Sequence, residues 1–179
     1  MAFTASKVAS EPWAILTHIF VHSPTDYMHL LNNLFFLTVF GTITEHYIGS
    51  RNFAILFLSS GAVASLSAFV YYPGSMVLGA SGAISGIVAF LAVLKPRRVG
   101  LFWGVPLPMW AVLVGWIATN LAGVGSSAGI AFEAHLFGLL FGAFTSLVYR
   151  TSRPSSRKRA SEIKIDRERI RRWEERYLM

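Results

Sequence analysis

Four long stretches of the sequence contain no aspartate, glutamate, lysine or arginine, and they locate the membrane-spanning part of the chain. They cover residues 27–44, 52–94, 99–132 and 134–149. A helix needs about 20 residues to cross the hydrocarbon core of a bilayer, so the second stretch has room for two spans, separated at Tyr71-Tyr72-Pro73-Gly74. The pattern predicts an all-α protein, a polytopic transmembrane bundle of about five helices at 29–48, 52–72, 81–94, 101–121 and 128–149.

The charged residues between the predicted helices indicate which way the bundle faces. The basic residues that follow the first, third and fifth helices are Arg51, Lys95, Arg97, Arg98 and Arg150. Cytoplasmic loops are enriched in lysine and arginine, so we expect this side to be cytoplasmic, with the N-terminus outside and the C-terminus inside. The predicted parts are an extracytoplasmic segment at 1–28, a transmembrane domain at 29–150 and a basic cytoplasmic tail at 151–179.

The composition supports a membrane protein and excludes other classes. Hydrophobic residues make up 54% of the 179 residues and charged residues 14%, against roughly 25% charged residues in ordinary soluble domains. Too few polar side chains are available to cover a globule, which excludes a soluble enzyme. The net charge of +7 is concentrated after residue 149, so it does not indicate a nucleic-acid-binding fold. The absence of cysteine excludes disulfides and thiolate metal sites.

The third predicted helix is too short to cross the bilayer. From Ser81 to Lys95 it covers about 21 Å at 1.5 Å per residue, whereas the hydrocarbon core is about 30 Å thick. If Lys95 lies at the inner surface, Ser81 lies roughly 9 Å below the outer one, and residues 73–80 enter the membrane as irregular backbone. Such backbone is tolerated only where it is buried in protein or lines a water-filled cavity, so we expect a cavity open to the outside. His135 lies at nearly the same depth, because about 22 Å of helix separates it from Arg150.

Small residues recur at every fourth position on two of the predicted helices. Such faces let membrane helices approach closely, and their contact would bring Ser81 next to His135. The two faces consist of Ser81, Ser85 and Ala89 on one helix, and of Ala134, Gly138, Gly142 and Ser146 on the other.

Ser81 and His135 are the candidate catalytic pair. A serine hydroxyl becomes a strong nucleophile when a neighbouring base takes its proton, and neutral imidazole is a suitable base near pH 7. The sequence Gly79-Ala80-Ser81-Gly82 places the serine at a helix N-terminus between glycines, where free backbone N–H groups can bind an oxyanion. His29 and Asn33, one turn apart on the first predicted helix, could donate hydrogen bonds to the same oxyanion.

Each of these features also has a purely structural explanation. Gly-x-Ser-Gly is common in membrane helices as a packing motif, and a lone histidine is as often a satisfied polar residue or a cofactor ligand as a base. Asn33 alone could be an interhelical hydrogen-bonding residue. His18, His22 and His29 could suggest a metal site, but no carboxylate or cysteine accompanies them at ligand spacing, so we expect neither metal nor other cofactor. A transporter would carry carboxylates inside the membrane, and the candidate carboxylates here lie at helix ends.

The order of these motifs resembles that of the rhomboid family of intramembrane serine proteases. The resemblance covers about residues 12–149 and depends on Thr17-His18-Ile19-Phe20-Val21-His22, His29-Leu30-Leu31-Asn32-Asn33, Gly41 and Glu45, Gly79-Ala80-Ser81-Gly82, and Ala134-His135-Leu136-Phe137-Gly138. It implies that Ser81 is the nucleophile and His135 the general base. It also implies an oxyanion hole made by His29, Asn33 and the Ser81 N–H, with supporting positions at Gly79, Gly82 and Gly138.

The chain departs from the family pattern at several places, two of which concern the nucleophile and the first helix. A tyrosine often follows the nucleophile by one turn in the family, and this chain has Ser85 there. The family core usually has a further helix before the matching segment, and we expect that first helix to be missing here.

The resemblance implies a protease that hydrolyses peptide bonds of transmembrane substrates near the outer membrane surface, by a Ser–His dyad and without a cofactor. Its partners would be transmembrane protein substrates and the lipid bilayer, with no nucleic acid. We expect a multi-pass protein of the cell membrane. The alternative is a catalytically silent rhomboid-like protein that binds membrane helices for quality control, and the presence of both Ser81 and His135 argues against it.

The predicted orientation can be tested with single cysteines, because the chain has none of its own. In Ser155→Cys, the thiol should react with a membrane-impermeant reagent only after the membrane is opened. In Ser10→Cys, on the expected outer side, it should react in intact cells. Equal labelling of the two variants in intact cells would contradict a cytoplasmic C-terminus.

Overall fold

The computed structural model describes residues 2–126, 129–152 and 167–178 of the chain. It contains two compact units, Met1–Val148 and Tyr149–Met179. Beyond residue 152 the second unit contains helix α10 (Arg167–Tyr177), in which Arg171 and Glu175 form an exposed ion pair at 3.5 Å.

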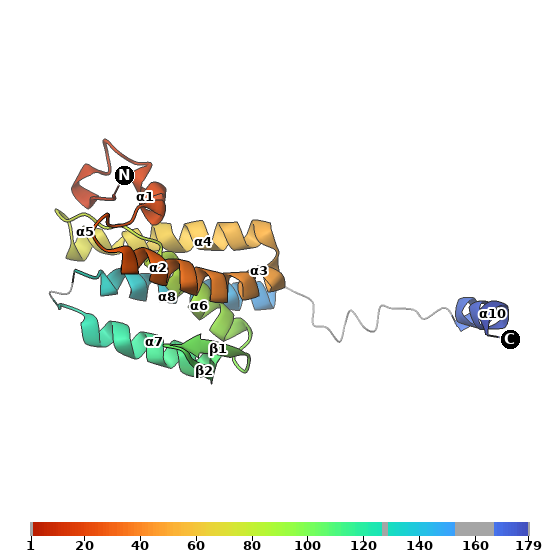
Figure 1. Ribbon diagram of the computed structural model, residues 1–179. Coiled ribbons are helices and arrows are strands. Elements are labelled where there is room, and N and C mark those ends of the chain that lie inside the picture. The colour runs from red at the N-terminus through yellow and green to blue at the C-terminus, as the bar shows by residue number, and fades with distance from the viewer. Residues whose placement is uncertain (1, 127–128, 153–166, 179) are drawn as a thin grey trace. The chain divides into compact units, whose positions relative to one another are not determined.

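Helices form most of the first unit (Figure 1). Its N-terminal part holds the short helices η1 (Ala5–Lys7), α1 (Ala14–Thr17) and η2 (His18–Phe20). A continuous helical rod follows, made of α2 (Tyr27–Phe36), the π-helical η3 (Leu37–Gly41) and α3 (Thr42–Ile48). The other helices of the bundle are α4 (Ser50–Ser65), α5 (Ser67–Tyr71), α6 (Ser81–Leu94), α7 (Met109–Gly123) and α8 (Phe132–Thr151). The fold is thus the helical bundle that the sequence predicts.

Helix α6 lies at the centre of this bundle. Every residue from Gly82 to Ala92 is buried, and the helix packs against α4, α7 and the rod formed by α2 and η3. Its sequence contains no charged residue and many small ones, so neighbouring helices can approach it from several sides. The bounds predicted for this helix, 81–94, are confirmed.

Helices α6 and α8 touch through their backbones. A Cβ added at Gly138 would overlap the carbonyl oxygen of Gly82, and one added at Gly142 would overlap the carbonyl oxygen of Gly86. Gly138 and Gly142 belong to the small-residue face predicted for the last helix, so that face and the approach of the two helices are confirmed. The face predicted on α6, Ser81 with Ser85 and Ala89, is wrong by one residue, because Gly82 and Gly86 make the contact.

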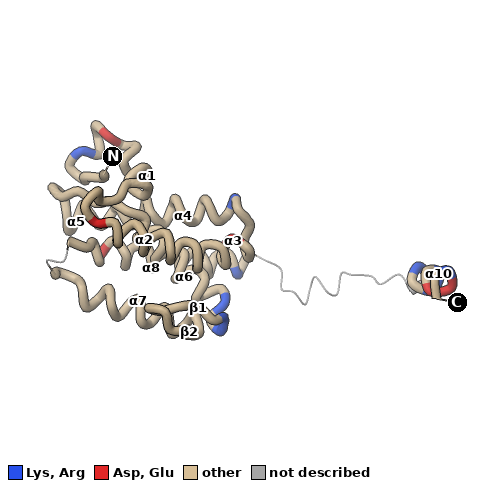
Figure 2. Tube along the Cα trace, in the orientation of Figure 1, with Lys and Arg blue, Asp and Glu red and all other residues tan. Residues whose placement is uncertain are grey.

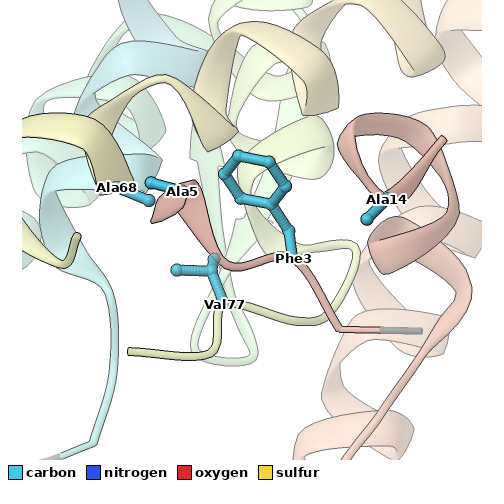
Figure 3. Packing of buried hydrophobic residues seen from close by; sticks show 5 residues of the cluster. All are labelled: Phe3, Ala5, Ala14, Ala68 and Val77. Atoms are coloured by element: carbon cyan, nitrogen blue, oxygen red, sulfur yellow. The ribbon is translucent and has the colours of Figure 1, made fainter. Parts of the chain in front are cut away.

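The segment between α5 and α6 is irregular, as predicted, and it obtains hydrogen bonds from the N-terminal part of the chain. Phe3 and Val77 exchange two backbone hydrogen bonds of 2.8 Å, and the N–H of Gly79 donates to the carbonyl oxygen of His18 at 3.0 Å. Backbone without regular structure needs such partners wherever water is scarce. The side chain of Phe3 is fully buried in a small apolar cluster with Ala5, Ala14, Ala68 and Val77 (Figure 3).

The start predicted for the fourth helix, at residue 101, is wrong. Residues 99–108 form an antiparallel hairpin of β1 (Val99–Phe102) and β2 (Val105–Pro108), and α7 begins only at Met109. The two-residue turn has Trp103 at φ 50 and Gly104 at φ 82, the left-handed pair that a tight hairpin turn favours. Proline at 106 and 108 also opposes a helix, because it lacks the backbone N–H.

The last helix also begins later than predicted. Ala128, its predicted first residue, lies outside the described residues, but residues 130 and 131 are not helical and α8 begins at Phe132. Among the described residues, two helical stretches have the length and composition needed to cross a membrane, Ser50–Tyr71 and Phe132–Thr151. Helices α6 and α7 are apolar but shorter.

Apart from Lys7 in the N-terminal part, the basic residues of the first unit gather at one end of the bundle. Figure 2 shows lysine and arginine where α3 passes into α4 and beside the β-hairpin. The α3 residue Tyr47 joins these two places, since its hydroxyl accepts a hydrogen bond of 3.0 Å from Arg98 and Lys95 Nζ lies 4.9 Å from its ring centroid. Basic residues that are distant in the sequence therefore lie on one side, as the charge pattern predicts.

Gly142→Ala should destabilise the bundle, because the new methyl group would meet the backbone of α6 rather than a movable side chain. We expect a loss of about 1–3 kcal/mol in the free energy of unfolding, the usual cost of overpacking, measured as a lower Tm in detergent. Gly74→Ala is the matched control, since no atom lies within 4 Å of a Cβ at that position. Equal Tm values for the two variants would contradict the backbone contact.

Candidate active site

The N-terminal turns of α6 and α8 carry a serine and a histidine in hydrogen-bonding contact. Ser81 is the first residue of α6, and His135 lies in the first turn of α8. Ser81 Oγ and His135 Nε2 are 2.7 Å apart. The contact of Gly82 with Gly138 lies immediately beside this pair and sets the spacing of the two helices. The structure therefore brings together the two residues that the sequence selects as a catalytic pair.

The other ring nitrogen of His135 contacts Asn120, a residue that was not selected from the sequence. Asn120 lies near the C-terminal end of α7 and is buried. Its Oδ1 is 2.6 Å from His135 Nδ1, and its Nδ2 donates to the carbonyl oxygen of Trp116 at 2.7 Å. In the sequence, Asn120 stands out only as a side-chain amide within a strongly apolar helix. It is uncharged and belongs to none of the motifs described above.

Trp116 ties this part of α7 to the central helix. Its indole Nε1–H donates to Ser85 Oγ on α6 at 3.2 Å, and its ring lies edge-on to Phe36. Ser85 occupies the position where the resemblance leads us to expect a tyrosine. An aromatic ring does lie beside His135, that of Phe132, with 6.2 Å between ring centroids.

His29 and Asn33 approach the same place from α2. A Cβ added at Gly79 would lie 2.7 Å from His29 Cε1 and 3.6 Å from Asn33 Nδ2, so both side chains lie beside the loop that leads into Ser81. Gly79 has φ +101, a conformation that glycine adopts without strain. Asn33 is buried, and its Nδ2 has no hydrogen-bond partner among the described residues. An unpaired buried donor is costly, which makes this amide available to a ligand.

Burial favours the neutral forms of His18 and His22, which lie outside the long helices. Burial lowers the pKa of His18, although its hydrogen bond with the Ala14 carbonyl opposes the shift. Burial and the nearby His29 lower the pKa of His22, whose ring centroid lies 5.3 Å from that of His29. Within the described ranges, no group of three or more histidine, aspartate or glutamate side chains is arranged to hold a metal ion.

The four candidate site residues line a cavity of about 650 Å³. Its wall includes the Ser81–His135 pair, the α2 residues His29 and Asn33, and Trp116. The irregular segment before α6 contributes Met76 to Gly79, as expected for backbone that borders an aqueous space. A second, open depression of about 720 Å³ lies beside Tyr47 and Lys95 and contains none of the candidate site residues.

The fold and this site define a helical membrane protein with a half-buried serine–histidine pair. Residues 9–152 match the family model of the Rhomboid domain. This match covers most of the chain, and the chain belongs to the rhomboid family, which includes intramembrane serine proteases.

Several characterised members of this family resemble the chain. It is 30% identical over 150 residues to the mitochondrial Rhomboid protein 1 of Saccharomyces cerevisiae, a match that covers 78% of this chain and 41% of that protein. It is 24% identical over 149 residues to the rhomboid protease GlpG of Haemophilus influenzae, with 82% and 74% covered. It is 29% identical over 136 residues to the rhomboid protease GluP of Bacillus subtilis, with 76% and 26% covered. The chain thus spans about two fifths of the length of its yeast relative.

Proposed function

We propose that this chain is an intramembrane serine protease that hydrolyses peptide bonds of transmembrane proteins near the outer membrane surface. The observation that carries the proposal is the 2.7 Å contact between Ser81 Oγ and His135 Nε2 in the wall of the cavity. A nucleophile paired with a base, next to unpaired hydrogen-bond donors, is the arrangement that covalent hydrolysis requires.

In the proposed reaction, Ser81 Oγ attacks the carbonyl carbon of the scissile bond while its proton passes to His135 Nε2. The carbonyl oxygen becomes an oxyanion, which accepts hydrogen bonds from Asn33 Nδ2, from His29 and from the N–H of Ser81. His135 then gives its proton to the leaving nitrogen as the C–N bond breaks, which leaves an ester on Ser81 and a free amine. Water attacks the ester with His135 as base, releases a carboxylic acid and restores the hydroxyl.

The proposed site of cutting follows from helix lengths. We assign five spans, formed by the rod from α2 to α3, by α4 with α5, and by α6, α7 and α8. Helix α6 has 14 residues and is therefore about 21 Å long, so Ser81 lies roughly 9 Å below the outer surface of a bilayer. A substrate helix must unwind there to expose its carbonyls, because a regular helix engages them in i to i−4 hydrogen bonds.

The proposed orientation has the N-terminus outside and the C-terminus in the cytoplasm. The basic end of the bundle, with Arg51, Lys95 and Arg98, supports it through the preference of lysine and arginine for the cytoplasmic side. Relatives of this chain include mitochondrial and bacterial proteins. We place this chain in the cell membrane.

Ser81→Ala and His135→Ala should each abolish cleavage of a transmembrane reporter, and to a similar degree, because the two residues act as one unit. Ser81→Ala should also lose covalent labelling by a fluorophosphonate probe in detergent. Ser59→Ala is the matched control, since that hydroxyl donates only within its own helix, to Ile55 and Leu56.

Two outcomes of that experiment would reject the proposal. Cleavage by a purified Ser81→Ala protein would rule out the mechanism. A wild-type protein that binds membrane helices but neither cleaves them nor reacts with the probe would favour the silent rhomboid-like alternative.

Asn33→Ala should lower kcat by roughly 10²- to 10³-fold and leave KM little changed, because an oxyanion donor acts on charge that develops in the transition state. Steady-state kinetics on the reporter measure both constants. Asn52→Ala provides the control, as it removes the same amide from a position outside the cavity, where Nδ2 donates to the carbonyl oxygen of Ile48. If Asn33→Ala raises KM alone, Asn33 binds substrate and is not an oxyanion donor.

A further inference from the structure

Asn120 contacts His135 but has no part in a mechanism built on two residues. We propose that Asn120 is a positioning residue: its side-chain carbonyl holds His135 in the form protonated at Nδ1, which leaves Nε2 free to take the proton of Ser81. This inference rests on the proposed protease function. It adds a third side chain, contributed by α7, to the pair formed by Ser81 and His135.

The two contacts of the Asn120 amide determine its orientation. Its Nδ2 lies 2.7 Å from the carbonyl oxygen of Trp116, which can only accept, so the NH₂ group must lie on that side. The carbonyl Oδ1 is then the atom 2.6 Å from His135 Nδ1. Because a carbonyl oxygen also only accepts, Nδ1 must carry the hydrogen. The free lone pair of a neutral ring is therefore on Nε2, which faces Ser81 Oγ at 2.7 Å.

Packing holds Asn120 in this position. The residue is 5% exposed, and it lies one helical turn after Trp116. The hydrogen bond from the Trp116 indole to Ser85 Oγ ties the same turn of α7 to α6, one turn below the nucleophile. A chain of hydrogen bonds thus runs from α6 through α7 to His135 on α8 and returns to α6 at Ser81.

The acid nearest to His135 in the sequence has a different partner. Glu133 is buried, and its carboxylate accepts a hydrogen bond from the hydroxyl of Tyr72 at the end of α5. The group placed against the His135 ring is instead a neutral amide. An amide is less costly to bury than a carboxylate, which suits a site below the membrane surface. It can still orient the ring and accept from Nδ1 throughout proton transfer.

Three variants distinguish a positioning role of Asn120 from a role in packing alone. Asn120→Leu keeps a similar side-chain volume but removes the acceptor, Asn120→Asp keeps an acceptor, and Thr119→Val is the control from the neighbouring position, where the hydroxyl bonds only within α7. We expect Asn120→Leu to lower kcat roughly a hundredfold with KM within about twofold of wild type, as for a misplaced catalytic group. Asn120→Asp should recover a large part of that loss, and Thr119→Val should match wild type.

A second measurement reports on His135 without any turnover. The imidazole ¹⁵N resonances of purified protein, with the His135 signals identified by their loss in His135→Gln, show which ring nitrogen is protonated. We expect the Nδ1-protonated form in wild type and a shift toward the Nε2-protonated form in Asn120→Leu. This readout stands even if Asn120→Leu folds poorly, because the wild-type spectrum alone tests the predicted form.

The outcomes distinguish this inference from the proposed function. A wild-type protein without cleavage or probe labelling would reject the protease function, and the ring protonation would still test the Asn120 contact. An Asn120→Leu enzyme with wild-type kcat, equal losses in Asn120→Leu and Asn120→Asp, or a wild-type ring protonated mainly at Nε2 would each overturn the positioning role.

Discussion

Two carbonyl groups of α6, at Gly82 and Gly86, lie directly against the backbone of α8 at Gly138 and Gly142. No side chain fits between the helices at these points, so the distance between their axes is set by main-chain atoms, which cannot adapt as side chains do. Ser81 and its partner histidine are placed by that distance. A methyl group in the contact would displace both helices and separate a pair that the proposed mechanism needs within hydrogen-bonding reach.

A second requirement is that the polar groups of the irregular backbone before α6 have hydrogen-bond partners. This segment is where the cavity opens beside the nucleophile, and its polar groups need partners. Phe3 supplies two backbone hydrogen bonds to Val77, and the His18 carbonyl supplies one to Gly79. The N-terminal part of the chain therefore helps to fix the loop that carries Gly79 beside His29 and Asn33.

Helix lengths and small-residue spacing are properties of single segments, and they were sufficient to predict α6 with its observed bounds and the approach of α8. The hairpin before α7 was missed because charge-free composition does not distinguish a strand from a helix, and the signal lay instead in Trp103-Gly104 and the flanking prolines. Asn120 was missed for a different reason. Its importance depends on which helix lies next to α8, and that neighbour is determined by the packing of the whole bundle.

The cavity beside Ser81 also bears on how water would take part in the proposed hydrolysis. Its volume is about 650 Å³, and a water molecule occupies about 30 Å³ in the liquid, so it has room for about 20 molecules. In the proposed protease, the water that hydrolyses the serine ester must come from this space. A peptide segment that fills the space would expel the molecules needed to release the segment from the ester. A closer fit would thus favour formation of the ester and slow its hydrolysis, so the size of the cavity sets a balance between the two steps.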